Sequence, residues 1–158
     1  DAAWKASSDG EIRLSASSDP ALRDRYKARM MALGISPGLF GLPMVTAAYA
    51  PEGAEWVDAL RVYVSKNARI FDDALARIPG AKSMKLQSTY LAWVDFSGMG
   101  LSAEDLHRRV EGQARIAANH GESFGTGGAA HMRFNIATPR ARVAEAVRRL
   151  QDAFADLQ

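Results

Sequence analysis

Arg133 is a residue of this sequence whose type and setting could bind a ligand. It lies in the stretch HMRFNIATPR, residues 131–140, where Met132, Phe134 and Ile136 alternate with polar side chains. That period of two predicts a half-buried strand with the arginine on its polar face. A guanidinium on a rigid strand offers a planar fork of donors that fits a carboxylate in a two-point contact. Because such an arginine is more often a solvated surface charge, the pattern alone leaves both interpretations open.

The other chemically capable residues do not form a recognisable set. His107, His120 and His131 lack metal-ligand spacing and the chain has no cysteine, so no metal site is expected. No G-x-S-x-G elbow or Ser/His/Asp grouping supports nucleophilic hydrolysis. The glycine-rich segment 121–128 matches neither the dinucleotide-binding nor the phosphate-loop spacing, and a turn is expected there. No self-sufficient catalytic set is therefore predicted.

The elements that must position the arginine follow from hydrophobic spacing and turn residues. Strands are predicted at residues 82–86, 89–96, 114–118 and 131–136, and the second is apolar on nearly both faces, as in a central strand. Helices are predicted at residues 20–33, 51–78 and 102–113, and from 139 onward. The expected fold is an α/β (α+β) two-layer sandwich, in which helices cover a small, mainly antiparallel sheet.

Capping residues support these helix starts. Asp19 before Pro20 and Ser102 fit N-caps, as does Thr138 before a proline suited to the first helical position. The long helix from residue 51 carries an apolar stripe that includes Trp56 and Tyr63, and this stripe is expected to be core.

Composition limits the classes of protein. The 158 residues are 47% hydrophobic, which is enough for a sizeable core, and they contain no apolar run of transmembrane length and no signal sequence. The 20 basic and 18 acidic residues nearly cancel and are interleaved, so neither nucleic acid nor a membrane is an expected partner. The absence of cysteine is compatible with a cytoplasmic location.

Several stretches carry a family likeness. In order along the chain they are STYLAWVDFSGMGLS (88–102), ARIAANHGESFGTGG (114–128) and MRFNIATPRARVAEAVRRL (132–150). Together they resemble the C-terminal portion of class I/II aminotransferases, most closely the branch that contains the pyridoxal-phosphate C–S β-lyases of the cystathionine β-lyase type. Upstream, DPALRDRYKARM, SPGLFG and EGAEWVDALRVYVSKN resemble the helices that join the large cofactor domain to the small domain. The likeness covers residues 19–158.

The resemblance implies roles for particular residues. Arg133 matches the arginine that binds the α-carboxylate of the amino-acid substrate. Tyr90 matches an aromatic near the active-site side of the small domain, with core packing as its alternative role. Asn135 and Thr126 are expected to be structural. The implied fold is the small domain of a fold-type I pyridoxal-phosphate enzyme.

The resemblance also implies a domain organisation. Residues 1–18 form a diverged lead-in, residues 19–50 the joining helices, and residues 51–158 the small domain. The pyridoxal phosphate of the parent enzyme belongs to a large domain that these residues do not include, so this chain alone is expected to carry no cofactor and to be inactive. Lys5 stands at about the family lysine's distance but in a different sequence context, and no role is assigned to it. A chain that begins at Asp1 rather than Met is expected to be a processed or truncated product.

Two functions remain open at this point. In the first, the parent enzyme transaminates an amino acid or eliminates a thiol from an S-substituted cysteine, and Arg133 anchors the substrate carboxylate. In the second, the chain is a stand-alone, non-catalytic module that binds a carboxylate or another protein. A surface normally covered by the large domain would then be partly apolar and favour a homodimer.

Overall fold

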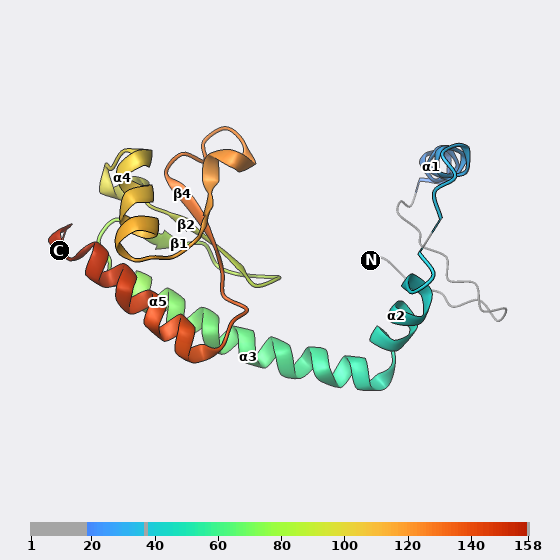
Figure 1. Ribbon diagram of the computed structural model, residues 1–158, viewed down its shortest axis with the longest axis horizontal. Helices are drawn as coiled ribbons and strands as arrows, with labels where there is room; N and C mark the ends of the chain where they lie inside the picture. Colours follow the sequence, from blue (N-terminus) through green and yellow to red (C-terminus); the bar gives the residue numbers. More distant parts are fainter. Residues whose placement is uncertain (1–18, 37, 158) are drawn as a thin grey trace. The chain divides into compact units, whose positions relative to one another are not determined.

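The computed structural model describes residues 19–36 and 38–157 (Figure 1). The chain divides between Val57 and Asp58 into two compact units, and this division falls inside helix α3 (Pro51–Leu75). The second unit contains the sheet and therefore positions the candidate site. Among the described helices, none combines the length and apolar character that a membrane crossing requires.

The described part of the first unit consists of helices without a core of their own. Helix α1 (Pro20–Ala32) begins as predicted, because the Asp19 carboxylate accepts the Ala21 N–H at 2.9 Å. Helix α2 (Gly41–Ala48) follows a bent connector. None of the described residues before Asp58 is buried.

The second unit is built around a four-stranded antiparallel sheet. The strand order is β1-β2-β4-β3. Their bounds are β1 Lys82–Ser83, β2 Leu91–Asp95, β3 Asn119–His120 and β4 His131–Asn135. With helices on one face of this sheet, the expected two-layer α/β architecture is confirmed.

The core lies between the sheet and two long helices, the second half of α3 and α5 (Arg140–Ala153), which lie beside the sheet in Figure 1. Side chains alternate along β2 and β4, so one face of each strand is buried. The rings of Phe71 in α3 and Phe134 in β4 lie 5.4 Å apart. The buried side chains of the two central strands and their extensions are Ala92, Val94, Phe96, Met132, Phe134 and Ile136.

Two strand predictions are wrong: one strand is absent and the other is shorter than predicted. Residues 114–118 form no strand: Arg115 has a left-handed φ of 53°, and pairing begins only at Asn119. Ala114 is nevertheless buried, and Ile116 and Ala118 pack partly against the core, so this segment contributes to packing from an irregular backbone. The strand predicted at 82–86 pairs over two residues only.

Helix α5 starts differently from the prediction. Its N-cap is Pro139, which keeps an extended ψ of 137° and makes no side-chain cap, so the prediction of Thr138 as N-cap is wrong. The Arg140 N–H instead donates to the hydroxyl of Tyr63 at 2.9 Å, and the Arg140 guanidinium lies over the ring of Tyr63. A side chain from α3 therefore satisfies one of the unpaired donors at this helix end.

The predicted apolar stripe of α3 is only partly core. Trp56 is 65% exposed and Tyr63 is 39% exposed, while Phe71 and Leu75 are buried. The prediction that both aromatics are core is therefore wrong. Buried positions in α3 begin at Val64, because only the second half of the helix lies against the sheet.

The region predicted as one helix at 102–113 is α4 (Ala103–His107) followed by the π-helical segment η2 (Arg108–Gln113). The Ser102 hydroxyl caps it as predicted, accepting the Asp105 N–H at 3.1 Å. The remaining short 3-10 segments are η1 (Ser97–Met99), η3 (Gly121–Phe124) and η4 (Ala155–Leu157).

An ion pair holds η2 to the end of the described chain. The Arg109 guanidinium donates to both carboxylate oxygens of Asp156, at 2.6 and 2.7 Å, and also to the Ala153 carbonyl. The hydrogen bond from Arg109 lowers the pKa of Asp156 below its ordinary value. This contribution to stability is present above the ordinary aspartate pKa and is lost as the pH falls through the lowered value.

Asn67 connects α3 to the strand that carries Arg133. Its side chain is fully buried, and its Nδ2 group donates to the carbonyls of Ile136 at 3.0 Å and Thr138 at 2.9 Å. The chain leaving β4 has no strand partner for these two carbonyls, so the amide of Asn67 satisfies them.

We expect Asn67→Leu to lower the free energy of unfolding by about 1–3 kcal/mol, because two carbonyls lose their donor inside the protein. Denaturant titration of the 158-residue chain, followed by circular dichroism, measures this change. Lys66→Ala on the exposed side of the same helix is the control and should change stability by less than about 0.5 kcal/mol. Equal effects of the two substitutions would contradict the role of Asn67.

Candidate functional site

Arg133 lies on the sheet face opposite the helical layer. In the antiparallel register it is paired with Trp93 of β2, and both side chains are half-buried. The neighbours of Arg133 along β4, Met132 and Phe134, are buried in the core on the other face. The strand alternation read from the sequence therefore placed the arginine on the correct face.

Two neighbours fix the guanidinium of Arg133. Its Nε and Nη2 groups donate to the side-chain oxygen of Asn119 at 3.4 and 3.1 Å. Its central carbon lies 4.4 Å from the centre of the Phe124 ring, as in a cation–π contact. No carboxylate among the described residues lies within ion-pair distance of this arginine. The edge formed by Nη1 and Nη2 thus keeps donors for a carboxylate from outside the described chain.

Aromatic rings surround this position. Trp93 stacks on His131 with ring centres 5.5 Å apart and meets Phe124 edge-on at 5.5 Å. These rings line a hollow of about 230 Å³ together with Gly121 and residues 125–128, and Arg133 is not among the residues that line it. The hollow adjoins the guanidinium of Arg133 through Phe124, which lines the hollow and also contacts the guanidinium.

A carboxylate borders the same face without reaching Arg133. His131 Nε2 lies 3.7 Å from Oδ1 of Asp95. Hydrogen bonds from Ser97 are the main cause that lowers the pKa of Asp95, and the charge of His131 contributes less. Asp95 is therefore a charged carboxylate at neutral pH, held by its own turn.

The glycine-rich segment that carries Phe124 is held by a close backbone approach. A Cβ atom on Gly121 would collide with the carbonyl oxygen of Gly128, and a Cβ on Gly128 would collide with the carbonyl of Gly121. Both glycines are buried, so the backbones meet without room for a side chain. The predicted turn is present, and its glycines bring η3 back against the start of β4.

The other predicted site residue, Tyr90, lies elsewhere. It lines a separate cavity of about 510 Å³ together with α3 residues that include Leu60 and Val64. Its role therefore stays a prediction, and the structure does not bring it into contact with Arg133. Asn135 caps its own turn by accepting the Ala137 N–H at 2.9 Å, and Thr126 lines the aromatic hollow. Lys5 lies outside the described residues.

A larger hollow, of about 700 Å³, lies between η2 and the end of α5. Its cations already have acidic partners within the chain, as in the Arg109–Asp156 pair at 2.6 Å and the Arg149–Glu145 pair at 3.7 Å. Arg133 differs because it has an orienting amide and no acidic partner among the described side chains. We therefore place the candidate ligand site at Arg133.

Sequence reasoning missed the residues that hold the arginine. Asn119, Phe124 and Trp93 are 14, 9 and 40 positions from Arg133, and only strand pairing and the folded glycine segment bring them together. The register of two antiparallel strands could have found Trp93, but no spacing rule points to Phe124. The structure also stacks the ring of His107 on that of His120, a contact that their separation of 13 positions in the sequence does not predict.

The fold and this site define a class of protein. A small antiparallel sheet, with helices on one face and an oriented arginine on the other, is consistent with the small domain of fold-type I pyridoxal-phosphate enzymes. No protein-family model matches the chain.

Comparison with known proteins extends this assignment. Cystathionine beta-lyase PatB of Bacillus subtilis (strain 168) is 32% identical over 138 residues, which cover 85% of this chain and 35% of that protein. Protein MalY of Escherichia coli (strain K12) is 33% identical over 119 residues, covering 75% of this chain and 30% of that protein. The structure of cystalysin from Treponema denticola, which contains a pyridoxal 5′-phosphate cofactor, superimposes with a TM-score of 0.77 at 28% identity, over 93% of this chain and 37% of that one.

The chain corresponds to the C-terminal portion of pyridoxal-phosphate-dependent enzymes of the cystathionine β-lyase and aminotransferase family. It spans about a third of the length of the relatives that it matches. The resemblance read from the sequence motifs is confirmed.

We expect Gly128→Ala to destabilise the chain by about 1–3 kcal/mol, because the added methyl group meets a backbone carbonyl that cannot turn away. Gly112→Ala in η2 is the matched control, since its Cβ meets only a side-chain atom at 4.0 Å. That helical substitution should be neutral or should stabilise by up to about 1 kcal/mol. Thermal unfolding of both variants measures the difference, and a stable Gly128→Ala chain would argue against the close approach.

Proposed function

We propose that this chain is the substrate-binding small domain of a pyridoxal-phosphate enzyme that acts on an amino acid, and that Arg133 binds the substrate α-carboxylate. The observation that carries the proposal is the oriented guanidinium without an acidic partner among the described residues. Similarity to the C-terminal third of pyridoxal-phosphate enzymes supports it.

In this proposal Arg133, Asn119 and Phe124 have separate roles in substrate binding. The free edge of the Arg133 guanidinium donates two charge-assisted hydrogen bonds to the substrate carboxylate. Asn119 holds the adjacent edge through Nε and Nη2, and Phe124 keeps the plane of the guanidinium fixed, so little side-chain freedom is lost when substrate binds. A carboxylate held at two points fixes the direction of the bonds at the substrate Cα, which makes Arg133 an orienting group rather than a proton carrier.

In the proposed enzyme, another part of the protein binds the cofactor. Pyridoxal phosphate, when bound, supplies the electron sink that stabilises negative charge at the substrate Cα. The family resemblance assigns the lysine, aspartate and stacked aromatic that hold it to the large domain, so we propose none of the described residues as a cofactor ligand. The described face fits the anionic end of an amino acid, since it presents one guanidinium fork beside the ring of Phe124.

Two reactions suit this arrangement. Elimination of a thiol from an S-substituted cysteine is favoured, because PatB, at 32% identity, is named a cystathionine beta-lyase. Transamination is the alternative, and both require the same carboxylate anchor. The groups that decide between them surround the cofactor and lie outside the residues described.

A second candidate function has one observation in its favour. Several large apolar side chains of the first unit are exposed, among them Met31 at 83%, Leu39 at 87% and Phe40 at 73%. Exposed apolar groups of this kind mark a surface for association. A cofactor domain would cover such a surface in the proposed enzyme, whereas a stand-alone module would use it to bind another protein or a second copy of itself.

The two functions differ in the mass and chemistry of the native protein that carries these residues. We expect borohydride reduction of that protein, purified without a tag, to fix a pyridoxyl group covalently on a chain much heavier than 17.1 kDa. Intact-mass spectrometry and the absorbance of the reduced adduct measure both properties. An unmodified native chain of 17.1 kDa would refute the enzyme proposal and favour the module.

In that enzyme we expect Arg133→Leu to lower kcat/KM for amino acids by about 10-fold or more, because charge-assisted hydrogen bonds contribute about 1.5–3 kcal/mol each. Cofactor absorbance should be unchanged. Turnover of an amine that lacks the carboxylate should change little, which separates carboxylate binding from a general loss of structure. Arg142→Leu on the exposed side of α5 is the matched control. Unchanged kinetics for Arg133→Leu would remove the assignment of this residue, while the cofactor result above would still stand.

A further inference from the structure

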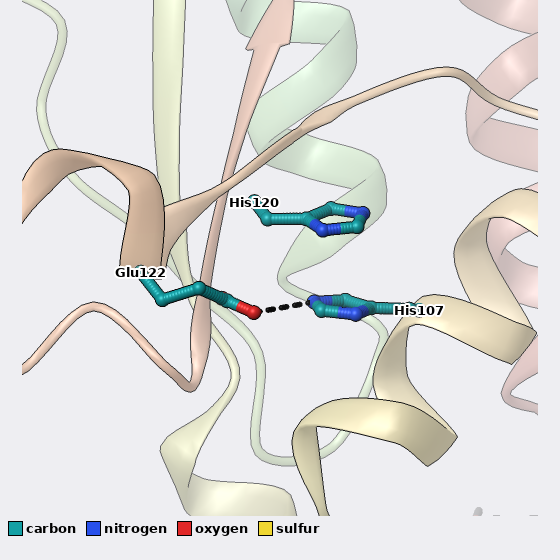
Figure 2. A group of neighbouring side chains, drawn as sticks. All are labelled: His107, His120 and Glu122. Atoms are coloured by element: carbon teal, nitrogen blue, oxygen red, sulfur yellow. Dashed lines mark ion pairs between the residues drawn. The ribbon is translucent and has the colours of Figure 1, made fainter.

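Three side chains on the edge of the second unit converge outside the site described above. His107 comes from α4, His120 from β3 and Glu122 from η3, and Figure 2 shows the two imidazole rings stacked, with the Glu122 carboxylate facing a nitrogen of His107. One ligand atom from each residue lies within 4.8 Å of the other two. The proposed substrate site uses none of these residues.

The Nε2 atom of His107 has no hydrogen-bond partner among the described residues, although it is buried from solvent. It lies 3.7 Å from Oε1 of Glu122, beyond hydrogen-bond range. Two protein ligands about 2.1 Å from one metal ion at a roughly tetrahedral angle lie about 3.4 Å apart. The 3.7 Å between Nε2 of His107 and Oε1 of Glu122 is therefore close to the distance between two ligand atoms of one metal ion.

His120 is oriented by a fourth residue. Its Nε2 lies 2.8 Å from Oε1 of Glu111, and because a carboxylate accepts, Nε2–H donates to it and Nδ1 is the ring nitrogen left for another ligand. Metal-binding histidines usually donate their second ring nitrogen to a carboxylate in this way. In Figure 2 a ring nitrogen of His120 lies above the His107 nitrogen that faces Glu122.

We propose that His107, His120 and Glu122 form a binding site for a divalent transition-metal ion of the zinc type, with Glu111 as the residue that orients His120. Two imidazoles and one carboxylate suit Zn²⁺ better than Mg²⁺ or Ca²⁺, which prefer sets of oxygen ligands. Three protein ligands leave a fourth tetrahedral position for water. The ion would tie α4 to the segment that leads into η3.

Ion binding requires one ring to turn. The two imidazoles are stacked with centres 3.6 Å apart and planes at 11°, and a metal ion lies in the plane of each imidazole that it binds. Because the two ring planes are nearly parallel, no metal position close to both ligand nitrogens can lie in the plane of both rings. The His120 side chain is 36% exposed against 18% for His107, so His120 is the ring that turns, about a terminal torsion with a broad energy profile. This turn moves Nε2, so the Glu111 side chain, which is 42% exposed, must follow it to keep their hydrogen bond.

Calorimetric titration of the untagged 158-residue chain with Zn²⁺ tests the site. We expect one ion per chain, and Co²⁺ at the same site should give the visible absorption bands of a tetrahedral ion. His107→Gln, His120→Gln and Glu122→Gln should each weaken Zn²⁺ binding by more than about 100-fold, the upper end for an outer-shell partner. Glu111→Gln should weaken it by about 10-fold. Circular dichroism checks that each variant is folded, and the exposed Glu122 keeps the test valid if His107→Gln does not fold.

His131→Gln is the matched control, because His131 is the third and last histidine of the chain and also lies 3.7 Å from a carboxylate, that of Asp95. It should bind Zn²⁺ as the unsubstituted chain does. In histidine NMR spectra, Zn²⁺ should shift the ring signals of His107 and His120 and leave those of His131 in place. Absence of binding by the unsubstituted chain, or equal loss in all three histidine variants, would overturn the proposal.

Discussion

The antiparallel pairing of β2 with β4 is the constraint on which the rest of the second unit depends. Its register places Trp93 opposite Arg133 and thereby sends Met132 and Phe134 to the opposite face. A slip by one residue would exchange the two sets, burying the arginine and exposing the core side chains. The burial of the apolar set therefore holds the guanidinium on the other face, so core packing and the placement of this cation are fixed by the same hydrogen bonds.

Pairing alone leaves the long arginine side chain free to move, and the segment before β4 removes that freedom. Two residues of β3 pair with β4 and bring Asn119 beside the guanidinium. The close approach of Gly121 and Gly128 folds η3 so that Phe124 covers it. Backbone sterics at two glycines thus determine the orientation of a charge several residues away, which explains a glycine pattern that matches no phosphate-binding motif.

The sequence was most informative where local rules act alone. Alternation placed Arg133 on the correct face, and the caps at Asp19 and Ser102 begin their helices as predicted. Local rules failed where distant residues compete with them. The hydroxyl of Tyr63 took the capping role expected of Thr138, and Asn67 bonded the carbonyl of that threonine.

Other features required the fold itself. The apolar run 114–118 packs without forming a strand, since burial can be satisfied from an irregular backbone that includes a left-handed Arg115. The pairing of Asn119 with Arg133 and the stacking of His107 on His120 depend on strand order and on the path of the glycine-rich segment, neither of which residue spacing encodes. Motif likeness succeeded because it compares whole ordered stretches, which carry this tertiary information implicitly.

The two units differ in how their stability can arise. The second has a continuous core that joins α3, α5 and the central strands. The first buries none of its described residues, and its helices α1 and α2, of 13 and 8 residues, are at or below the length at which an isolated helix is stable in water. Most helical stability in proteins comes from packing an apolar face, so these helices need a surface beyond the described residues of their unit. A cofactor domain of the kind proposed would supply that surface.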